Sequence, residues 1–256
     1  MTDTSRWLRA VRNSHDRIAL LLKPLGDSEV TAPSYATEWT IAQVASHLGS
    51  QAEIFALFLQ AGLAGQPGPD GSVFAPIWDR WNALTPMQQV TESVTANEEF
   101  VTTLEHVPAD QQQTFALSMF GTDLDLAGLA ALRLGEHAVH TWDIAVALEP
   151  TARLAPDAVE LLIDRIPQTA ARVGKPAPGI DPVTIDISEP ERRFQLTLSP
   201  DVALAPDASV GSTGTLRLPA EALIRLVYGR LRPDTTPAEV ADDARLVQLR
   251  KVFPGF

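Results

Sequence analysis

The segment from Leu124 to Leu148 constrains the fold most. Apolar and ionisable residues recur in it every three or four positions, which is the spacing of one face of an α-helix. That row is Leu126, Leu129, Arg133, Glu136, His140, Ile144 and Ala147. Apolar residues at both ends indicate that this face points into a helical bundle. Because unpaired buried charges are costly, the three ionisable side chains in the middle should be paired or bind a metal.

Three further segments in the first 150 residues show helical periodicity. Thr40 is the expected N-cap of one, and Thr85-Pro86-Met87-Gln88 combines a capping box with proline at the first helical position. The expected helices are Ser5–Pro24, Thr40–Gly62 and about Pro86–His106. Together with Leu124–Leu148 they predict a four-helix bundle over residues 1–150.

The pattern changes after Pro150. A helix is expected from about Pro156 to Val173, followed by three runs that alternate with period two, as half-buried strands do. These runs are Val183–Ile187, Phe194–Leu198 and Gly214–Leu218, and helical patterns resume at Pro219–Leu231 and Asp242–Phe253. Residues 151–256 therefore predict a smaller α+β domain.

Charge and composition exclude several classes of function. The 256 residues contain 20 Lys and Arg against 32 Asp and Glu, a net charge of −12, which disfavours nucleic acid and anionic membranes as partners. No apolar run approaches the ~20 residues of a membrane helix, and the polar N-terminus resembles no signal peptide, so a cytoplasmic protein is expected. Cysteine is absent, so any thiol chemistry must take its sulfur from a small molecule.

Glu136 and His140 are four residues apart, which lets both side chains reach one ion from adjacent helical turns. His47, at the edge of the apolar stripe of the second helix, would complete a three-ligand set with open positions for water or substrate, as in catalytic metal sites. The spacing alone is also common in helix-stabilising pairs, and His47 could be a hydrogen-bonded core histidine. His137 competes with Glu136 as a ligand, and His15 is either a fourth ligand or a core histidine.

Two roles are open for Asp143, one turn beyond His140. Its carboxylate could orient a ligand imidazole, or it could tie the end of the helix to a loop. Trp39 and three other tryptophans could line a pocket, although aromatic residues in a bundle are usually core.

Four segments carry a resemblance to a known family. Glu38–Leu48, with its Trp-Thr…His pattern, resembles the start of the second helix of DinB-like metalloproteins. Arg133–Asp143 resembles the R-x-x-E-x-x-x-H-x-x-D segment of the mycothiol-dependent maleylpyruvate isomerase family within that group. Leu226–Arg230 and Leu246–Gly255 look like parts of that family's sterol-carrier-like second domain. The resemblance covers nearly the whole chain.

The resemblance implies a divalent metal, usually zinc, held by His47, Glu136 and His140. It also implies mycothiol, the small thiol of actinobacteria, and a substrate-binding arginine in the second domain. Arg230 is the first candidate for that arginine, with Arg217, Arg225 and Arg232 nearby. The implied partners are a small-molecule thiol and a small electrophilic substrate.

Three functions therefore remain open. The chain is a metal- and mycothiol-dependent isomerase or thiol S-transferase, a DinB-like metal-dependent enzyme without mycothiol such as a hydrolase, or a non-catalytic protein that binds an apolar ligand. Metal content separates the first two from the third, and a thiol requirement separates the first from the second. The sequence is compatible with a monomer or a small homo-oligomer.

Overall fold

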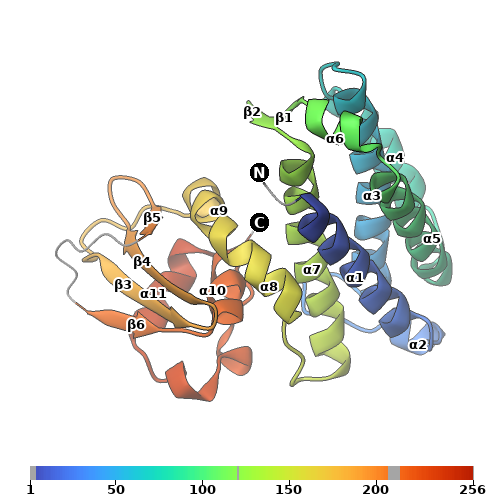
Figure 1. The fold of residues 1–256 in the computed structure, drawn as a ribbon. Helices are drawn as coiled ribbons and strands as arrows, with labels where there is room; N and C mark the ends of the chain where they lie inside the picture. Colours follow the sequence, from blue (N-terminus) through green and yellow to red (C-terminus); the bar gives the residue numbers. More distant parts are fainter. Residues whose placement is uncertain (1–3, 120, 207–213, 256) are drawn as a thin grey trace. The chain divides into compact units, whose positions relative to one another are not determined.

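The computed structural model describes residues 4–119, 121–206 and 214–255, and Figure 1 shows its fold. Four long helices dominate the first part: α1 (Thr4–Leu22), α3 (Ile41–Leu63), α5 (Pro86–Glu105) and α7 (Leu126–Leu148). Both α1 and α3 pack against α5 and α7, so α1 and α3 lie on one diagonal of the bundle. The expected four-helix bundle is confirmed, with its first two long helices facing each other across the centre.

Side-chain caps begin three of these helices. The Thr40 hydroxyl accepts the Gln43 backbone N–H at 3.2 Å, and the Gln43 side chain accepts the Thr40 N–H at 2.9 Å. Thr85 and Gln88 form the same reciprocal box before α5. Asp125 caps α7 through the Gly128 N–H at 2.7 Å. Each cap satisfies N–H groups that lack partners in the first helical turn, which fixes where the helix begins.

Short elements that the periodicity did not predict connect the long helices. They are α2 (Asp27–Val30), the 3₁₀ turn η1 (Gly71–Val73), α4 (Phe74–Asn82), α6 (Ala109–Thr114) and the antiparallel strands β1 (Leu117–Met119) and β2 (Thr122–Leu124). Of these, α4 packs directly on α3. The Trp81 indole, only 2% exposed, lies against Gly49 and donates to Glu53 at 2.8 Å.

The core of the bundle lies among α1, α3, α5 and α7 and the loop that precedes α3. One cluster of its buried residues consists of Ile18, Leu22, Leu25, Val30, Ala36, Ile41, Ala42, Val44, Ala45, Leu48, Val90 and Ile144. Ile144 belongs to the row of α7 residues that the sequence places inside the bundle. Leu126, Leu129 and Ile144 on either side of Glu136 and His140 are buried as expected, whereas Ala147 at the end of the row is exposed.

The chain divides into two compact units between Ala158 and Val159, rather than at the expected Pro150. The first unit extends further because Asp157 accepts hydrogen bonds from Asn13 and Arg17, at 2.8 and 2.6 Å. The helix expected from Pro156 to Val173 is interrupted. It consists of α8 (Pro156–Leu162), η2 (Ile163–Arg165) and α9 (Ile166–Val173), with a proline at the start of α9, where a missing N–H is tolerated.

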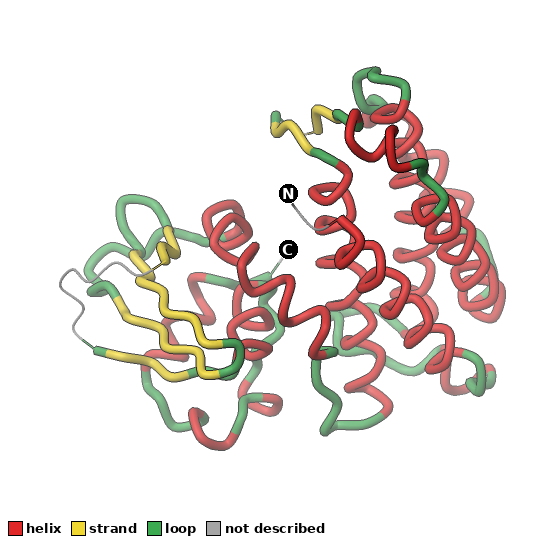
Figure 2. The backbone as a smooth tube through the Cα atoms, in the orientation of Figure 1, coloured by secondary structure: helices red, strands yellow, loops and turns green. Residues whose placement is uncertain are grey.

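The second unit is built on one four-stranded sheet (Figure 2). The strands β3 (Val183–Ser188), β4 (Glu191–Thr197), β5 (Ala203–Pro206) and β6 (Thr215–Arg217) lie in the order β5-β4-β3-β6. β3 pairs antiparallel with β4, and parallel with β6. The sequence missed β5, which is too short to show an alternating pattern and ends in a proline. The remaining elements are α10 (Ala220–Val227), η3 (Pro233–Thr235), η4 (Ala238–Val240) and α11 (Arg245–Val252).

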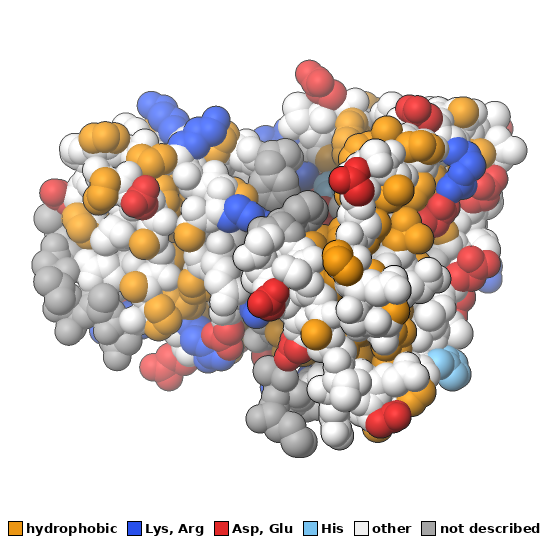
Figure 3. All heavy atoms as spheres, turned by 90° about the horizontal axis from the view of Figure 1, so that it is seen from above, with side chains coloured by type: hydrophobic (Ala, Val, Ile, Leu, Met, Phe, Trp, Pro, Cys, Tyr) orange, Lys and Arg blue, Asp and Glu red, His pale blue; other side chains and the backbone are white. Residues whose placement is uncertain are grey.

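On the face drawn in Figure 3, Asp and Glu side chains are spread singly rather than gathered in one patch. Among the described residues, no helix has the length and apolar character needed to cross a membrane.

We expect Gly49→Ala to destabilise the protein by about 1–3 kcal/mol, the usual cost of overpacking a core. An added Cβ at Gly49 would lie 2.2 Å from the buried Trp81 ring, which the bond to Glu53 holds in place. Denaturant unfolding of the full chain measures the change. Gly71→Ala is the control, because a Cβ there meets open space. Equal unfolding midpoints for the two variants would show that α4 is not held as described.

Candidate metal centre

Two imidazoles and one carboxylate converge between α3 and α7. The Glu136 Oε2 atom lies 3.6 Å from His47 Nε2 and 3.9 Å from His140 Nε2. One ligand atom from each of the three residues lies within 4.8 Å of the others. The structure thus brings together the three residues that the sequence singled out from two separate helices.

The His140 ring is oriented by Asp143. Its Nδ1 lies 2.9 Å from the Asp143 carboxylate, which is fully buried. This contact uses Nδ1 and leaves the other ring nitrogen, Nε2, facing Glu136. The Asp143 backbone carbonyl also accepts the Tyr35 N–H at 3.0 Å. Both roles considered for Asp143 are therefore present, one in its side chain and one in its backbone.

The Glu136 carboxylate is ionised and held in place. Burial alone would raise the pKa of Glu136, but the facing His47 ring, the neighbouring His140 and a hydrogen bond from Gln51 lower that pKa to about 2. The Gln51 amide donates to Glu136 Oε2 at 2.9 Å. A carboxylate fixed in its charged form is suited to bind a cation.

His47 offers an unused nitrogen. Burial is the largest influence on its ring and lowers the pKa of His47, which keeps the imidazole neutral near pH 7. Its Nε2 is buried and has no hydrogen-bond partner among the described residues, although it points towards Glu136. Buried polar atoms are rarely left without a partner, so this atom is available to bind a cation.

The three donors fit a divalent cation of the zinc type. Two neutral imidazole nitrogens and one carboxylate oxygen are ligands that Zn²⁺ accepts, and three protein ligands leave a position open for another molecule. The orphaned His47 nitrogen and the oriented His140 nitrogen both face the carboxylate oxygen. The chemistry and the placement of the donor set therefore agree.

Trp39 forms an aromatic wall beside the two histidines. Its ring centroid lies 5.0 Å from that of His47 and 6.1 Å from that of His140. The preceding Glu38 has a φ of 69°, which is uncommon for a residue with a side chain. The Ser34 N–H and hydroxyl both donate to the Trp39 carbonyl at 2.8 Å. These contacts hold the loop that presents the indole, which is 37% exposed.

Arg133, the third ionisable residue of the row, is fully buried behind the centre. Its guanidinium donates to the Leu48 carbonyl at 2.9 Å, to Gln51 Oε1 at 2.8 Å and to Asn97 Oδ1. It forms no ion pair with Glu136 in the described structure. The sequence predicted that Arg133 would be paired, but gave no sign that its partners would be uncharged. Gln51 and Asn97 were not identified from the sequence, because polar amides at helical positions carry no distinctive pattern.

The two competing histidines lie elsewhere in the bundle. His137 is buried, and its Nδ1 is hydrogen-bonded to the Ser14 hydroxyl at 2.8 Å. His15 Nε2 lies 2.9 Å from Glu98 Oε2, so His15 is a hydrogen-bonded histidine and not a fourth member of the centre.

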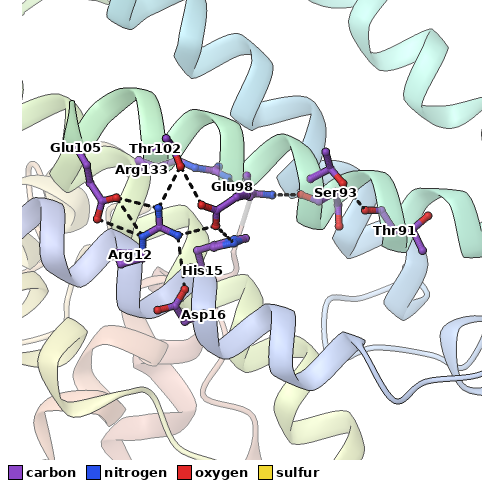
Figure 4. Close-up of polar contacts among 11 residues, drawn as sticks. Arg12, His15, Asp16, Thr91, Ser93, Glu98, Thr102, Glu105 and Arg133 are labelled. Atoms are coloured by element: carbon purple, nitrogen blue, oxygen red, sulfur yellow. Dashed lines mark hydrogen bonds and ion pairs between the residues drawn. The ribbon is translucent and has the colours of Figure 1, made fainter. Parts of the chain in front are cut away.

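His15, Asp16 and Glu98 form a second group with metal-like spacing, but Arg12 already occupies it (Figure 4). Arg12 lies 2.6 Å from Glu98 and 3.7 Å from Asp16, so both carboxylates of this group already face a fixed positive charge. The hydrogen bond from Arg12 is the largest effect on Glu98 and lowers the pKa of Glu98 to about 2. This group is an ion-pair network that joins α1 to α5.

The arginines of the second unit differ in their surroundings. Arg225 is buried, paired with Glu221 at 2.9 Å, and donates to the Thr235 carbonyl at 2.8 Å, which is a structural arrangement. Arg230 follows α10, is half-buried, and donates to the Tyr228 carbonyl at 3.0 Å. Arg217 is exposed on β6, and Arg232 immediately precedes η3.

The two C-terminal segments that carry the resemblance meet in space. Gly229 has a φ of 69°, and a Cβ there would lie 2.3 Å from the Gly255 backbone nitrogen. Only glycine allows the chain end to approach this closely. Arg230 therefore sits directly beside a fixed crossing of the two segments.

The fold and the site together define a class, a helical bundle with a His–Glu–His set between two helices, followed by an α+β unit. A family model described as the mycothiol maleylpyruvate isomerase N-terminal domain matches residues 11–145, more than half of the chain. The chain belongs to this family. Comparison with curated protein sequences gives no significant match.

Two solved structures with a TM-score of 0.67 share the fold of this chain. The crystal structure of the mycothiol-dependent maleylpyruvate isomerase matches with a TM-score of 0.67 and 13% identity, and the match covers 89% of each chain. The structure of a histidine-to-alanine mutant of that enzyme matches equally well. YfiT from Bacillus subtilis, described as a probable metal-dependent hydrolase with an unusual four-helix bundle topology, is 14% identical with a TM-score of 0.46, over 59% of this chain and 89% of its own.

Acid titration tests the assignment of the second group as an ion-pair network. Because the pKa of Glu98 is about 2 in the folded chain and ~4.3 when unfolded, Glu98 contributes stability above ~pH 4.3 that is lost as the pH falls towards 2. We therefore expect the stability advantage of the parent over Glu98→Gln to shrink below about pH 4.5. The parent in this comparison is the His15→Gln variant, and the second chain carries both His15→Gln and Glu98→Gln. The His15 imidazole therefore titrates in neither chain. An advantage that stays constant down to about pH 3 would contradict the network.

Proposed function

We propose that this protein is a metal-dependent enzyme that uses mycothiol as its thiol to isomerise, or to transfer the thiol to, a small electrophilic substrate. The observation that carries the proposal is the convergence of His47, Glu136 and His140 within 4.8 Å, in a chain whose family is named for a mycothiol-dependent isomerase. The matched solved structure, which is described as that isomerase, supports the same direction.

The proposed ligands of the cation are His47 from α3 and Glu136 and His140 from α7. His140 is buried, His47 and Glu136 are half-buried, and Asp143 keeps the His140 nitrogen aimed at the centre. A bound divalent cation would favour the thiolate form of a thiol over the neutral form and could polarise a substrate carbonyl. Zinc is the proposed metal, on the basis of the nitrogen and oxygen donors.

The thiol has to be an external molecule, because the chain contains no cysteine. A thiolate adds reversibly to an activated double bond, and rotation about the resulting single bond before the thiol leaves gives the other isomer. Trp39, beside both histidines, supplies an apolar surface for the substrate. Arg230 is proposed to bind a substrate carboxylate, because its planar guanidinium can bind both oxygens of that group.

We expect about one divalent ion, most readily zinc, in each chain purified without added metal, and loss of that ion in His47→Ala and His140→Ala. Each substitution removes one of only three protein ligands. Elemental analysis measures the content. His106→Ala is the control, since His106 is exposed at the end of α5 and should leave the metal in place. Full occupancy in the two site variants would remove the proposed ligand set.

Calorimetry tests the thiol. Mycothiol should bind to the zinc-loaded protein and much more weakly to the metal-free protein, because the cation's charge stabilises the thiolate. If mycothiol binds equally well with and without metal, or not at all, the protein has another metal-dependent activity.

Arg230→Lys should keep the affinity for mycothiol and raise the KM of a carboxylate substrate in steady-state kinetics. The lysine keeps the positive charge but loses the planar guanidinium that can bind both carboxylate oxygens.

A further inference from the structure

The Glu136 carboxylate is also held by a chain of hydrogen bonds that leads through Gln51 to Arg133. Gln51 lies on α3, one helical turn after His47, so both side chains leave the same face of that helix. Its Nε2 donates to Glu136 Oε2 at 2.9 Å, and its Oε1 accepts from Arg133 Nη1 at 2.8 Å. The oxygen that Gln51 contacts is the same one that faces both imidazole Nε2 atoms.

The chemistry of the neighbours fixes the orientation of the Gln51 amide. A guanidinium only donates hydrogen bonds and an ionised carboxylate only accepts them. The amide oxygen must therefore face Arg133, and the amide nitrogen must face Glu136. The opposite orientation would oppose donor to donor and acceptor to acceptor.

Arg133 is a rigid anchor for this chain. It is fully buried, donates to the Leu48 carbonyl and to Asn97, and lies over the rings of Phe55 and Phe100 at 5.5 and 5.9 Å. Its position is thus set by α3 and α5 as well as by α7. An amide attached to such an anchor has little freedom to rotate.

Gln51 also separates the positive charge of Arg133 from Glu136. A direct bidentate pair between a guanidinium and a carboxylate would use the oxygen lone pairs that a cation needs. The intervening amide donates one hydrogen bond to Glu136 Oε2 and leaves another lone pair of that oxygen available to a cation. Asp143 gives His140 similar support, and outer partners of this kind orient metal ligands in proteins generally.

We propose that Gln51 is a positioning residue, which holds Glu136 Oε2 towards the two histidines through a hydrogen-bond relay anchored at Arg133. The inference rests on the proposed metal site and is independent of the thiol and of the substrate. Gln51 contacts the proposed ligand Glu136 and lies one turn after the proposed ligand His47 on the same face of α3. It is not itself a proposed ligand.

Gln51→Met tests the relay, because methionine has a similar length and removes both hydrogen bonds. We expect the zinc affinity to fall about 10- to 100-fold, the usual cost of losing an outer partner, measured by competition with a chromogenic chelator. At saturating Co²⁺, the visible absorption bands of the variant should also shift, because the carboxylate is no longer fixed. Gln60→Met, at an exposed position on the same helix, is the matched control and should change neither reading.

A second variant separates positioning from folding. Gln51→Met leaves Nη1 of a buried guanidinium unpaired in addition to Nε, which has no hydrogen-bond partner among the described residues, and this could destabilise the fold. In Arg133→Met/Gln51→Met that cation is gone, and methionine can pack against the two phenylalanine rings. Thermal unfolding of the metal-free protein should then recover relative to the single variant, while the zinc affinity stays low.

Two results would overturn the inference. One is a wild-type zinc affinity and Co²⁺ spectrum in Gln51→Met. The other is recovery of zinc affinity together with stability in the double variant, which would show that Gln51 acts only on the fold. A wild-type protein that binds neither Zn²⁺ nor Co²⁺ would instead overturn the proposed function, and this inference with it.

Discussion

A guanidinium removed from water must find its hydrogen bonds within the protein, and the two terminal nitrogens of Arg133 find them on two other helices, whereas its Nε has no partner among the described residues. The Leu48 carbonyl and the Gln51 amide lie on α3, and Asn97 lies on α5. Burial lowers the pKa of Arg133 to about 9, against the opposing influence of Glu136, so the group stays charged at neutral pH. One side chain from α7 thereby ties three of the four long helices together. The Glu136 carboxylate of the centre is connected to Arg133 through the Gln51 amide.

The neutral character of these partners has a chemical effect. Arg133 and Glu136 attract each other through space, but no salt bridge consumes the carboxylate. The bundle therefore contains a fixed positive charge and a fixed negative charge one helical turn apart, with an amide between them. A direct salt bridge between Arg133 and Glu136 would also have paired both charges. It would have left the His47 and His140 imidazoles without an anionic partner.

The sequence could predict positions on a helix but not partners across the bundle. Three- and four-residue spacing placed Glu136 and His140 inside, and Thr40 and Thr85 predicted where two helices begin. His47 was identified as the histidine at the edge of the second helix's apolar stripe. Gln51 and Asn97 were missed because their roles depend on which helices are neighbours. The same reason applies to α4, whose place depends on Trp81 meeting Gly49, and to the pairing of β5 with β4.

Asp143 links the centre to the loop that precedes α3. Its carboxylate holds His140, and its carbonyl holds Tyr35 in the loop that ends at Trp39. One residue of α7 therefore contacts both the His140 ring and the loop that carries the Trp39 indole. A displacement of α7 at Asp143 would move the imidazole and the start of that loop together, so the two aromatic rings beside Glu136 depend on the position of one backbone segment.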